Sequence, residues 1–441
     1  MKAFYFLLVT FLLFSATSFA KKPNQEWARI YAEQLFHITE VMVTDVASPP
    51  VAARIYAYST LASFLAVKDL ETDSFLPDFV EISNLGPIPS PTIPDELSRE
   101  FIGIYSMLLV GEQIMPSGYL LKEKQKDWLS WAIKQKIITR KNQEAHVQLA
   151  EEIKSNILQL AKTDGYVQLT ALPRYSPKED EGTWYPTPPA YMAAVEPQWK
   201  TMRTFFIQNL EDFSPRSMAE FDLSEGSSFK NQLEEVIEVT KSLTEEQKLI
   251  ANFWDCNPFA VEFTGHMAIG IKKISPGGHW IGITGIAAQM ENMDFLSTSY
   301  IHALVGMTLH DAFVSCWKAK YETHRIRPET VINQQIDPKW KPLLQTPPFP
   351  EYTSGHSVIS TAVARVLTEF FGDNFEFMDS SEVYFGLPER KFSSFNQAAS
   401  EAAISRLYGG IHFRDAIENG VLQGEKIAEH ILTRLQVKQI P

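Results

Sequence analysis

The chain has 441 residues, of which 45% are hydrophobic and 21% are charged, a balance that is ordinary for a folded globular protein. This length is enough for one large domain or two, with a substantial core. The formal net charge of -13 argues against nucleic acids and anionic membrane surfaces as partners.

Residues 1–20 have the pattern of a secretory signal peptide. Lys2 precedes an apolar stretch over 4–14, and small residues lead to an expected cleavage after Ala20. An uncleaved anchor is the alternative, but the apolar stretch is short for a membrane span. No later run has the length and apolarity of a span. We therefore expect a soluble, exported protein, periplasmic or secreted, without stable membrane insertion.

Residues 21–441 are predicted to form a single large helical domain. In its N-terminal half, residues 21–244, a proline-rich and aromatic segment at 163–228 either shapes the mouth of a site or forms a structural belt. The C-terminal half, residues 245–435, carries the chemical motifs. Apolar residues recur at helical spacing over 26–43, 50–67, 95–115, 122–160, 228–241, 297–321, 358–371 and 397–407, and from 412 to about 435.

The central motif is the stretch 351–357, which links the proline-rich run 347–350 to an apolar helical pattern. Ser354, Gly355 and His356 therefore lie where a constrained loop becomes a helix. The start of a helix offers unpaired N–H groups and a partial positive charge, which suit an oxyanion. Gly355 lets the backbone approach a ligand closely. Alone, this pattern also fits an ordinary helix cap.

Two further motifs add positive charge to this acidic chain. Lys320 is followed after six residues by Arg327, and Arg406 is followed after five residues by His412. Pro328 disfavours a helical conformation at Arg327, which can then turn back towards Lys320. If these residues converge with the central motif, they form a cage for a tetrahedral oxyanion, because guanidinium groups donate paired hydrogen bonds to neighbouring oxygens.

The three motifs, in this order and spacing, resemble the signature of the type 2 phosphatidic acid phosphatase and vanadium-dependent haloperoxidase superfamily. The similarity is greatest to exported bacterial haloperoxidases of the iodoperoxidase-like kind, and it covers roughly residues 245–430. It implies an all-α fold, the large helical bundle of the vanadium haloperoxidase and acid phosphatase type. The helical N-terminal half suits the large haloperoxidases better than the small phosphatases.

The resemblance implies an enzyme that uses hydrogen peroxide to oxidise iodide or bromide to hypohalous acid. Vanadate would be the cofactor, and phosphate can occupy the same site. His412 would be the axial metal ligand and a catalytic residue. Lys320 would polarise the bound peroxide, and His356 would assist proton transfer. The remaining oxygens would be held by Lys320, Arg327, Ser354, Gly355 and Arg406.

The same cage also fits an exported acid phosphatase that acts on soluble phosphoesters. His412 would then be the nucleophile that forms a phosphohistidine, and His356 would protonate the leaving alcohol. A non-catalytic member that only binds an oxyanion is a second alternative.

The chain departs from the family pattern in two places. Thr353 stands where proline is usual, and we expect little effect because Pro350 still stiffens the loop. Ala416 stands where an aspartate usually follows the last histidine, and the nearest acid is Asp415. A carboxylate three residues after His412 on a helix either reaches the ring or leaves His412 less well oriented as a nucleophile. An axial ligand depends less on such a carboxylate than a nucleophile does, so this departure favours vanadate binding.

Other residues have two interpretations each. Trp317 and Phe349 either surround the halide or pack in the core, and Asp255 and His279 either border the site or are ordinary buried polar groups.

Cys256 and Cys316 either pair, since export permits a disulfide, or remain buried free thiols. No grouping of histidine, cysteine and carboxylate has convincing zinc spacing, so no conventional protein-ligated metal cluster is expected. The oligomeric state is left open.

Overall fold

A computed structural model describes residues 26–69, 79–188, 190–264 and 267–436. The predicted signal peptide lies outside these residues. The all-α prediction is confirmed, because the described chain is mainly helical and its strands form only two short antiparallel hairpins. No helix in the described ranges combines the length and apolarity that a membrane span requires.

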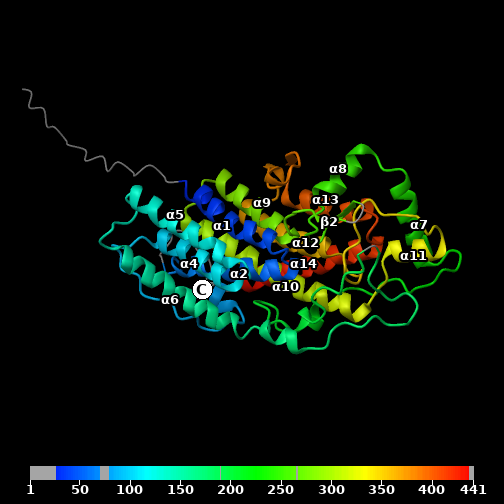
Figure 1. Cartoon of the computed structure of the whole chain (residues 1–441), viewed down its shortest axis with the longest axis horizontal. Coiled ribbons are helices and arrows are strands. Elements are labelled where there is room, and N and C mark those ends of the chain that lie inside the picture. The colour runs from blue at the N-terminus through cyan, green and yellow to red at the C-terminus, as the bar shows by residue number, and fades with distance from the viewer. Residues whose placement is uncertain (1–25, 70–78, 189, 265–266, 437–441) are drawn as a thin grey trace, which may run out of the picture.

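The helices form an elongated bundle whose two ends come from different parts of the chain (Figure 1). One end holds α4 (Arg99–Ile114), α5 (Leu121–Lys134) and α6 (Gln143–Ala161), and the other holds α7 (Ser228–Lys241) and α11 (Pro328–Gln335). Helices from both halves of the chain fill the space between these ends.

α10 (Phe295–Thr323) is the central helix of the bundle and is buried on nearly all sides. Its apolar and small residues run around the whole circumference, a pattern typical of a helix enclosed by others. Asp294 caps its first turn by accepting a backbone N–H at 2.7 Å. α2 (Pro49–Leu65) packs along it, and a Cβ atom on Gly306 would lie 3.0 Å from Ala57 Cα. The glycine therefore sets how closely these two helices approach.

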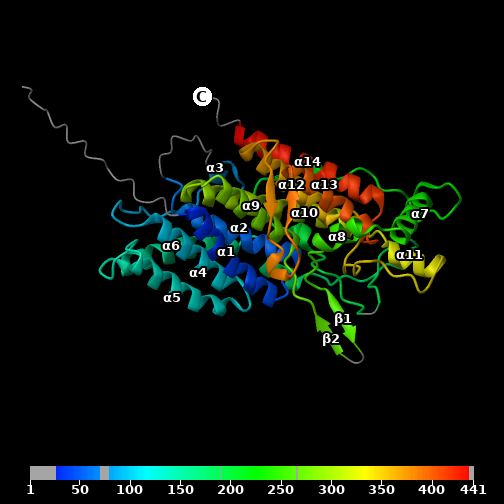
Figure 2. The same ribbon diagram turned by 90° about the horizontal axis from the view of Figure 1, so that it is seen from above.

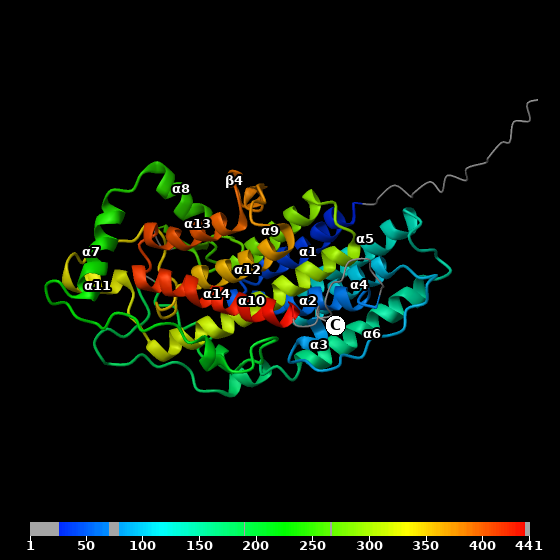
Figure 3. The same ribbon diagram turned by 180° about the vertical axis from the view of Figure 1, so that it is seen from behind.

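α12 (Gly355–Phe371) packs against α10, α13 (Phe395–Tyr408) and α14 (Arg414–Gln436) (Figure 3). A Cβ atom on Gly424 would lie 2.4 Å from the Val358 carbonyl oxygen, so only glycine permits the contact between α14 and α12. α12 ends before Gly372, the C-cap residue, which adopts a φ of 91°.

The β1–β2 hairpin projects from the bundle (Figure 2). Thr244 caps the start of α8 and forms a capping box with Gln247. The other described α-helices and strands are α1 (Trp27–Thr44), α3 (Phe79–Ile82), α8 (Glu245–Phe253), α9 (Pro276–Met290), β1 (Val261–Thr264), β2 (Met267–Gly270), β3 (Phe377–Asp379) and β4 (Arg390–Phe392).

Two predicted helix boundaries were wrong. The pattern over 122–160 is divided into α5 and α6 by a turn in which Lys136 has a φ of 60° and Thr139 bonds Asn142. Local side-chain hydrogen bonds of this kind compete with the helix. The last helix begins at Arg414, which leaves His412 on the preceding loop.

The proline-rich segment 163–228 is attached to α10 by a buried carboxylate. Asp311 accepts backbone N–H groups from three successive residues, Phe205, Phe206 and Ile207, at 2.6, 2.7 and 3.1 Å. Burial raises the pKa of Asp311 to about 7, although these hydrogen bonds oppose the rise. The structure thus supports the interpretation of this segment as a structural belt.

Replacing Asp311 with alanine should destabilise the fold strongly. The substitution leaves three buried N–H groups without an acceptor, and we expect a loss of at least about 3 kcal/mol in the free energy of unfolding. Denaturant unfolding measures this loss. The matched control is Asp127→Ala on the exposed surface of α5, which should change the same free energy by less than about 0.5 kcal/mol. Equal effects of the two substitutions would contradict this role of Asp311.

Candidate functional site

A cavity of about 40 Å³ lies beside the start of α12. This volume holds about three or four water molecules, since each needs roughly 10–15 Å³ by the same measure. A small inorganic anion therefore fits, whereas a bulky substrate does not. Residues singled out from the sequence line much of its wall: Gly355, His356, Arg406, His412, Trp317 and Phe349.

Lys320 lies behind this wall and is fully buried near the end of α10. Its Nζ atom donates to the carbonyl oxygens of Pro350, Glu351 and Thr353 at 3.2, 3.0 and 2.5 Å. Burial lowers the pKa of Lys320 to about 8. The ammonium group is thus held by a rim of backbone carbonyls and is easier to deprotonate than an ordinary lysine.

The two arginines of the motifs are held in the same way. Arg327 donates from Nε to the Phe349 carbonyl at 3.0 Å and from one terminal nitrogen to the Ile411 carbonyl at 2.9 Å. Arg406 donates to the Trp254 carbonyl at 2.7 Å. Burial lowers the pKa of Arg327 to about 10 and also lowers that of Arg406.

The three cations have no carboxylate partner of their own. Within the described ranges, none of Lys320, Arg327 and Arg406 forms an ion pair, and Glu351 pairs instead with Arg325 and His412. Carbonyl groups satisfy N–H donors but do not neutralise their charge. Buried charge that is not paired is costly. The site therefore carries an excess of positive charge that an anion would compensate.

His412 points one nitrogen at these cations and the other at a carboxylate. Its Nδ1 lies 2.8 Å from Glu351 Oε1, which also accepts the N–H of Phe413 at 2.9 Å. An ionised carboxylate only accepts, so Nδ1 carries the proton and Nε2 keeps its lone pair. Nε2 lies 3.1 Å from a terminal nitrogen of Arg327. Burial, followed by the charges of Arg327 and Lys320, holds the pKa of His412 well below its usual range.

The carboxylate that contacts this ring is Glu351, whereas Asp415 has other partners. Asp415 bonds Arg325 at 2.5 Å and accepts the backbone N–H of Ala219 at 2.9 Å. Arg325 in turn contacts Glu351 at 3.3 Å. Asp415 lies in the first turn of α14, whereas Glu351 reaches the ring from the central loop. The only hint of this contact in the sequence was that Glu351, the first residue of the central motif, is an acid.

The start of α12 adds further polar groups. Ser354 is buried, and its hydroxyl oxygen accepts the N–H of Ser357 at 3.4 Å, which caps the helix as predicted. The nearest atom to a Cβ on Gly355 would be in the Trp317 ring, at 3.8 Å. Nε2 of His356 is buried and finds no hydrogen-bond partner among the described residues. Burial and then Arg406 hold the pKa of His356 well below its usual range.

The predicted aromatic residues form one side of the cavity. The Trp317 and Phe349 rings lie 5.0 Å apart, and Lys320 Nζ lies 5.8 and 5.1 Å from their centres. Trp317 Nε1 donates to the Val195 carbonyl at 3.2 Å. The segment 163–228 therefore also supports the cavity wall. It acts both as a structural belt and as part of the surroundings of the site.

The remaining candidates lie at or behind the wall. Asp255 and Cys256 line the cavity, while His279 is buried behind it. Cys256 and Cys316 are both buried free thiols. Although the sequence showed no convincing zinc spacing, the fold brings ligand atoms of Cys256, His279 and Glu382 within 4.8 Å of one another. These residues are far apart in the sequence, so their spacing gave no indication.

Comparison with known proteins identifies the fold and the family. A sequence model described as the VCPO second helical-bundle domain matches residues 300–439, and no curated protein sequence matches the chain. The crystal structure of a bacterial vanadium-dependent iodoperoxidase is 39% identical to this chain, with a TM-score of 0.84, and the match covers 93% of this chain and 96% of that one. The chain belongs to the vanadium-dependent haloperoxidase family.

A more distant member shares the fold. A holo-type bacterial vanadium-dependent chloroperoxidase is 15% identical to this chain, with a TM-score of 0.66, and the match covers 89% of this chain and 93% of that one. The family resemblance and the enzyme class inferred from the three motifs are therefore confirmed.

Neutralising Glu351 should weaken anion binding more than neutralising Asp415. In Glu351→Gln the amide no longer holds the proton on Nδ1 of His412, and loss of such a partner typically costs about 10–100-fold in metal affinity. Equilibrium dialysis of the purified variants against vanadate measures this loss of affinity. Asp415→Asn is the matched control, because it changes a neighbouring carboxylate that touches Arg325 but not the ring. A larger loss in Asp415→Asn would contradict this assignment.

Proposed function

We propose that this haloperoxidase binds vanadate in the cavity and uses hydrogen peroxide to oxidise iodide or bromide to hypohalous acid. The observation that carries the proposal is the group of three buried cations, without carboxylate partners among the described residues, beside the unprotonated Nε2 of His412. The 39% identical iodoperoxidase supports the halide class. Chloride oxidation demands the strongest oxidant and is not proposed. The signal-peptide pattern at residues 1–20 supports export of the protein.

The residues at the cavity fit a vanadate ion. The donor set combines one neutral imidazole nitrogen for the metal with cations and N–H or O–H donors for its oxygens. His412 Nε2 would be the protein ligand of the metal, and Glu351 would keep the ring in the required tautomer. The oxygens would be held by Lys320, Arg327, Arg406, the Ser354 hydroxyl and the Gly355 N–H.

Bound vanadate supplies Lewis acidity that activates hydrogen peroxide without a change of metal oxidation state. The protein's own groups then manage protons and charge. His356 has a free Nε2 and is neutral at neutral pH, so it would accept a proton from hydrogen peroxide and return it as the hypohalous acid leaves. Lys320 would polarise the peroxide oxygen that the halide attacks. Trp317 and Phe349 would exclude water on the side where the halide approaches.

The cage also supports a second candidate, an acid phosphatase. Phosphate is a tetrahedral oxyanion, and His412 Nε2 is as free to attack phosphorus as to ligate vanadium. The sequence departure at Ala416 had weakened this reading, but Glu351 supplies the carboxylate that orients the nucleophile. Activity assays are therefore needed to distinguish the haloperoxidase from the phosphatase.

The first test compares both activities on the chain from Lys21 onward, purified without phosphate. After incubation with orthovanadate and desalting, we expect triiodide formation from iodide and hydrogen peroxide, and phosphate should compete it away. p-Nitrophenyl phosphate is offered to the same preparation. Hydrolysis that vanadate inhibits, without any halide oxidation, would establish the phosphatase and overturn the proposal.

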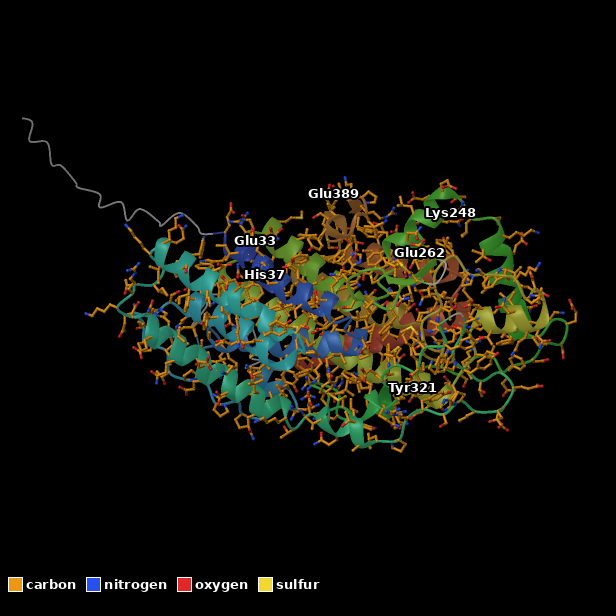
Figure 4. All side chains as sticks on the ribbon, viewed as in Figure 1. Glu33, His37, Lys248, Glu262, Tyr321 and Glu389 are labelled. Carbon is orange, nitrogen blue, oxygen red and sulfur yellow. The ribbon has the colours of Figure 1, made fainter. Side chains whose placement is uncertain are left out.

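Removal of the axial ligand should abolish turnover while the fold persists. In His412→Ala, iodide oxidation should fall by at least about 100-fold, because vanadate loses its protein ligand, while the helical circular dichroism remains. His37→Ala is the control, since His37 on α1 is well separated from Tyr321, the neighbour of Lys320 (Figure 4). Full activity in His412→Ala would refute the site.

Vanadate affinity should depend on the protonation of Lys320. Its pKa is lowered to about 8, so the ammonium form prevails below that pH and is lost above it. Because the anion prefers the charged form, affinity should fall above pH 8 by up to about tenfold per pH unit. Dissociation constants measured on both sides of pH 8 test this.

Two variants separate this effect from the protonation of vanadate itself, which all samples share. Lys320→Arg keeps its charge throughout, so any remaining fall in affinity belongs to vanadate. Lys320→Met should bind weakly at every pH. The same profile in the wild type and in Lys320→Arg would show that Lys320 does not titrate in this range.

A further inference from the structure

Three buried side chains meet behind the cavity and offer one sulfur, one nitrogen and one oxygen atom. Cys256 Sγ lies 3.4 Å from His279 Nδ1 and 3.9 Å from Glu382 Oε1, and His279 Nδ1 lies 3.1 Å from Glu382 Oε1. The three residues are 2%, 0% and 4% exposed. None of them takes part in the proposed reaction, so the chemistry of this group needs another account.

The triangle that these atoms form has the dimensions of a zinc coordination face. Zinc binds thiolate at about 2.3 Å, imidazole nitrogen at about 2.0–2.1 Å and carboxylate oxygen at about 2.0–2.2 Å. In a tetrahedral site these bonds place the ligand atoms roughly 3.3–3.6 Å apart. The three separations of 3.1, 3.4 and 3.9 Å bracket those values, so a cation can enter with movements of a few tenths of an ångström.

A fourth residue holds the histidine in the orientation that a ligand needs. His279 Nε2 lies 2.8 Å from Asp379 Oδ2, and the other oxygen of Asp379 accepts from the N–H and hydroxyl of Ser381 at 3.0 and 2.7 Å. A carboxylate on one ring nitrogen places the proton there and frees the other nitrogen for a metal. Here that other nitrogen, Nδ1, is the one that faces Cys256 and Glu382.

We propose that Cys256, His279 and Glu382 bind a divalent cation of the zinc type, with Asp379 as the positioning carboxylate. Binding would displace the proton of the Cys256 thiol, and the cation would neutralise the resulting thiolate together with Glu382. With three protein ligands, the fourth position would be taken by water, which can arrive from the cavity that Cys256 lines.

The cation would brace one wall of the active site. It would tie together three segments that are distant in the sequence: the turn after α8, the first turn of α9 and the loop after β3. Trp254, in the first segment, stacks on His279 with ring centres 4.4 Å apart, and its carbonyl accepts from Arg406. The cation site and the oxyanion site would not compete, because one offers anionic donors and the other cationic ones.

The same contacts also describe a metal-free cluster in which a protonated His279 lies between Asp379 and Glu382. Both alternatives satisfy the buried polar atoms, but they differ in metal content and in the response to chelators. The experiment is therefore designed around metal binding rather than activity, and its outcome does not depend on whether vanadate turnover is found.

The wild-type chain is tested first. It is treated with a chelator, dialysed against Zn²⁺ or Co²⁺ and desalted, and the metal per chain is measured by mass spectrometry. We expect one equivalent with or without vanadate, thiolate-to-cobalt charge-transfer absorption in the Co²⁺ form, and a lower Tm after chelation. A chain that binds neither ion, yet keeps its circular dichroism and Tm, would overturn the proposal in favour of the metal-free cluster.

Substitutions then locate the ion. Cys256→Ala should lose the charge-transfer band and the bound metal, and Glu382→Gln should weaken binding at least about tenfold. Cys316→Ser is the matched control, because it removes the other buried thiol, which contacts Thr353, and should retain one equivalent. Undiminished binding in Cys256→Ala, or loss of binding only in Cys316→Ser, would place the metal elsewhere and refute the assignment.

Discussion

The active site depends on one electrostatic constraint: three positive charges are buried together, and among the described residues their hydrogen-bond partners are backbone carbonyls, the Ser405 hydroxyl and His412, none of which is a carboxylate. The loop around Phe349 and Pro350 turns its carbonyl oxygens towards Lys320 and Arg327. Proline has no backbone N–H that could form competing hydrogen bonds, and its ring fixes its φ angle. A proline-rich loop therefore holds these carbonyl groups in place at a low cost in conformational entropy. The loop carbonyls accept hydrogen bonds from the cations but do not neutralise their positive charge. An anion can therefore bind and compensate this charge.

Glu351 links this loop to the residue that would hold the metal. Its backbone carbonyl accepts from Lys320, while its side chain fixes His412. Glu351 thus both accepts a hydrogen bond from Lys320 and determines which nitrogen of the His412 ring carries the proton. A carboxylate also limits the net positive charge of the site, and Arg325, which also contacts Asp415, holds that carboxylate in place. The missing aspartate at Ala416 therefore does not leave His412 without support.

The large helical frame places these parts. α10 presents Trp317 and Lys320 one turn apart and then stops at His324, whose φ of 52° turns the chain. The next residues pair with the belt, where the N–H of Ile326 donates to the Gly182 carbonyl at 2.8 Å. That pairing brings Arg327 back towards Lys320. The belt, attached to the same helix through Asp311, is therefore part of the scaffold of the site.

The sequence by itself determined the helices with strong periodicity, the helix start at Ser354 and the order of the three motifs. These features depend on local spacing and on motif order, which a single chain displays directly. Only the tertiary structure decided the partners that meet across long separations. His412 and Glu351 are 61 positions apart, and Cys256 and Glu382 are 126 apart. Such pairings follow from how buried charges and polar atoms find partners once the helices pack, and no local pattern records them.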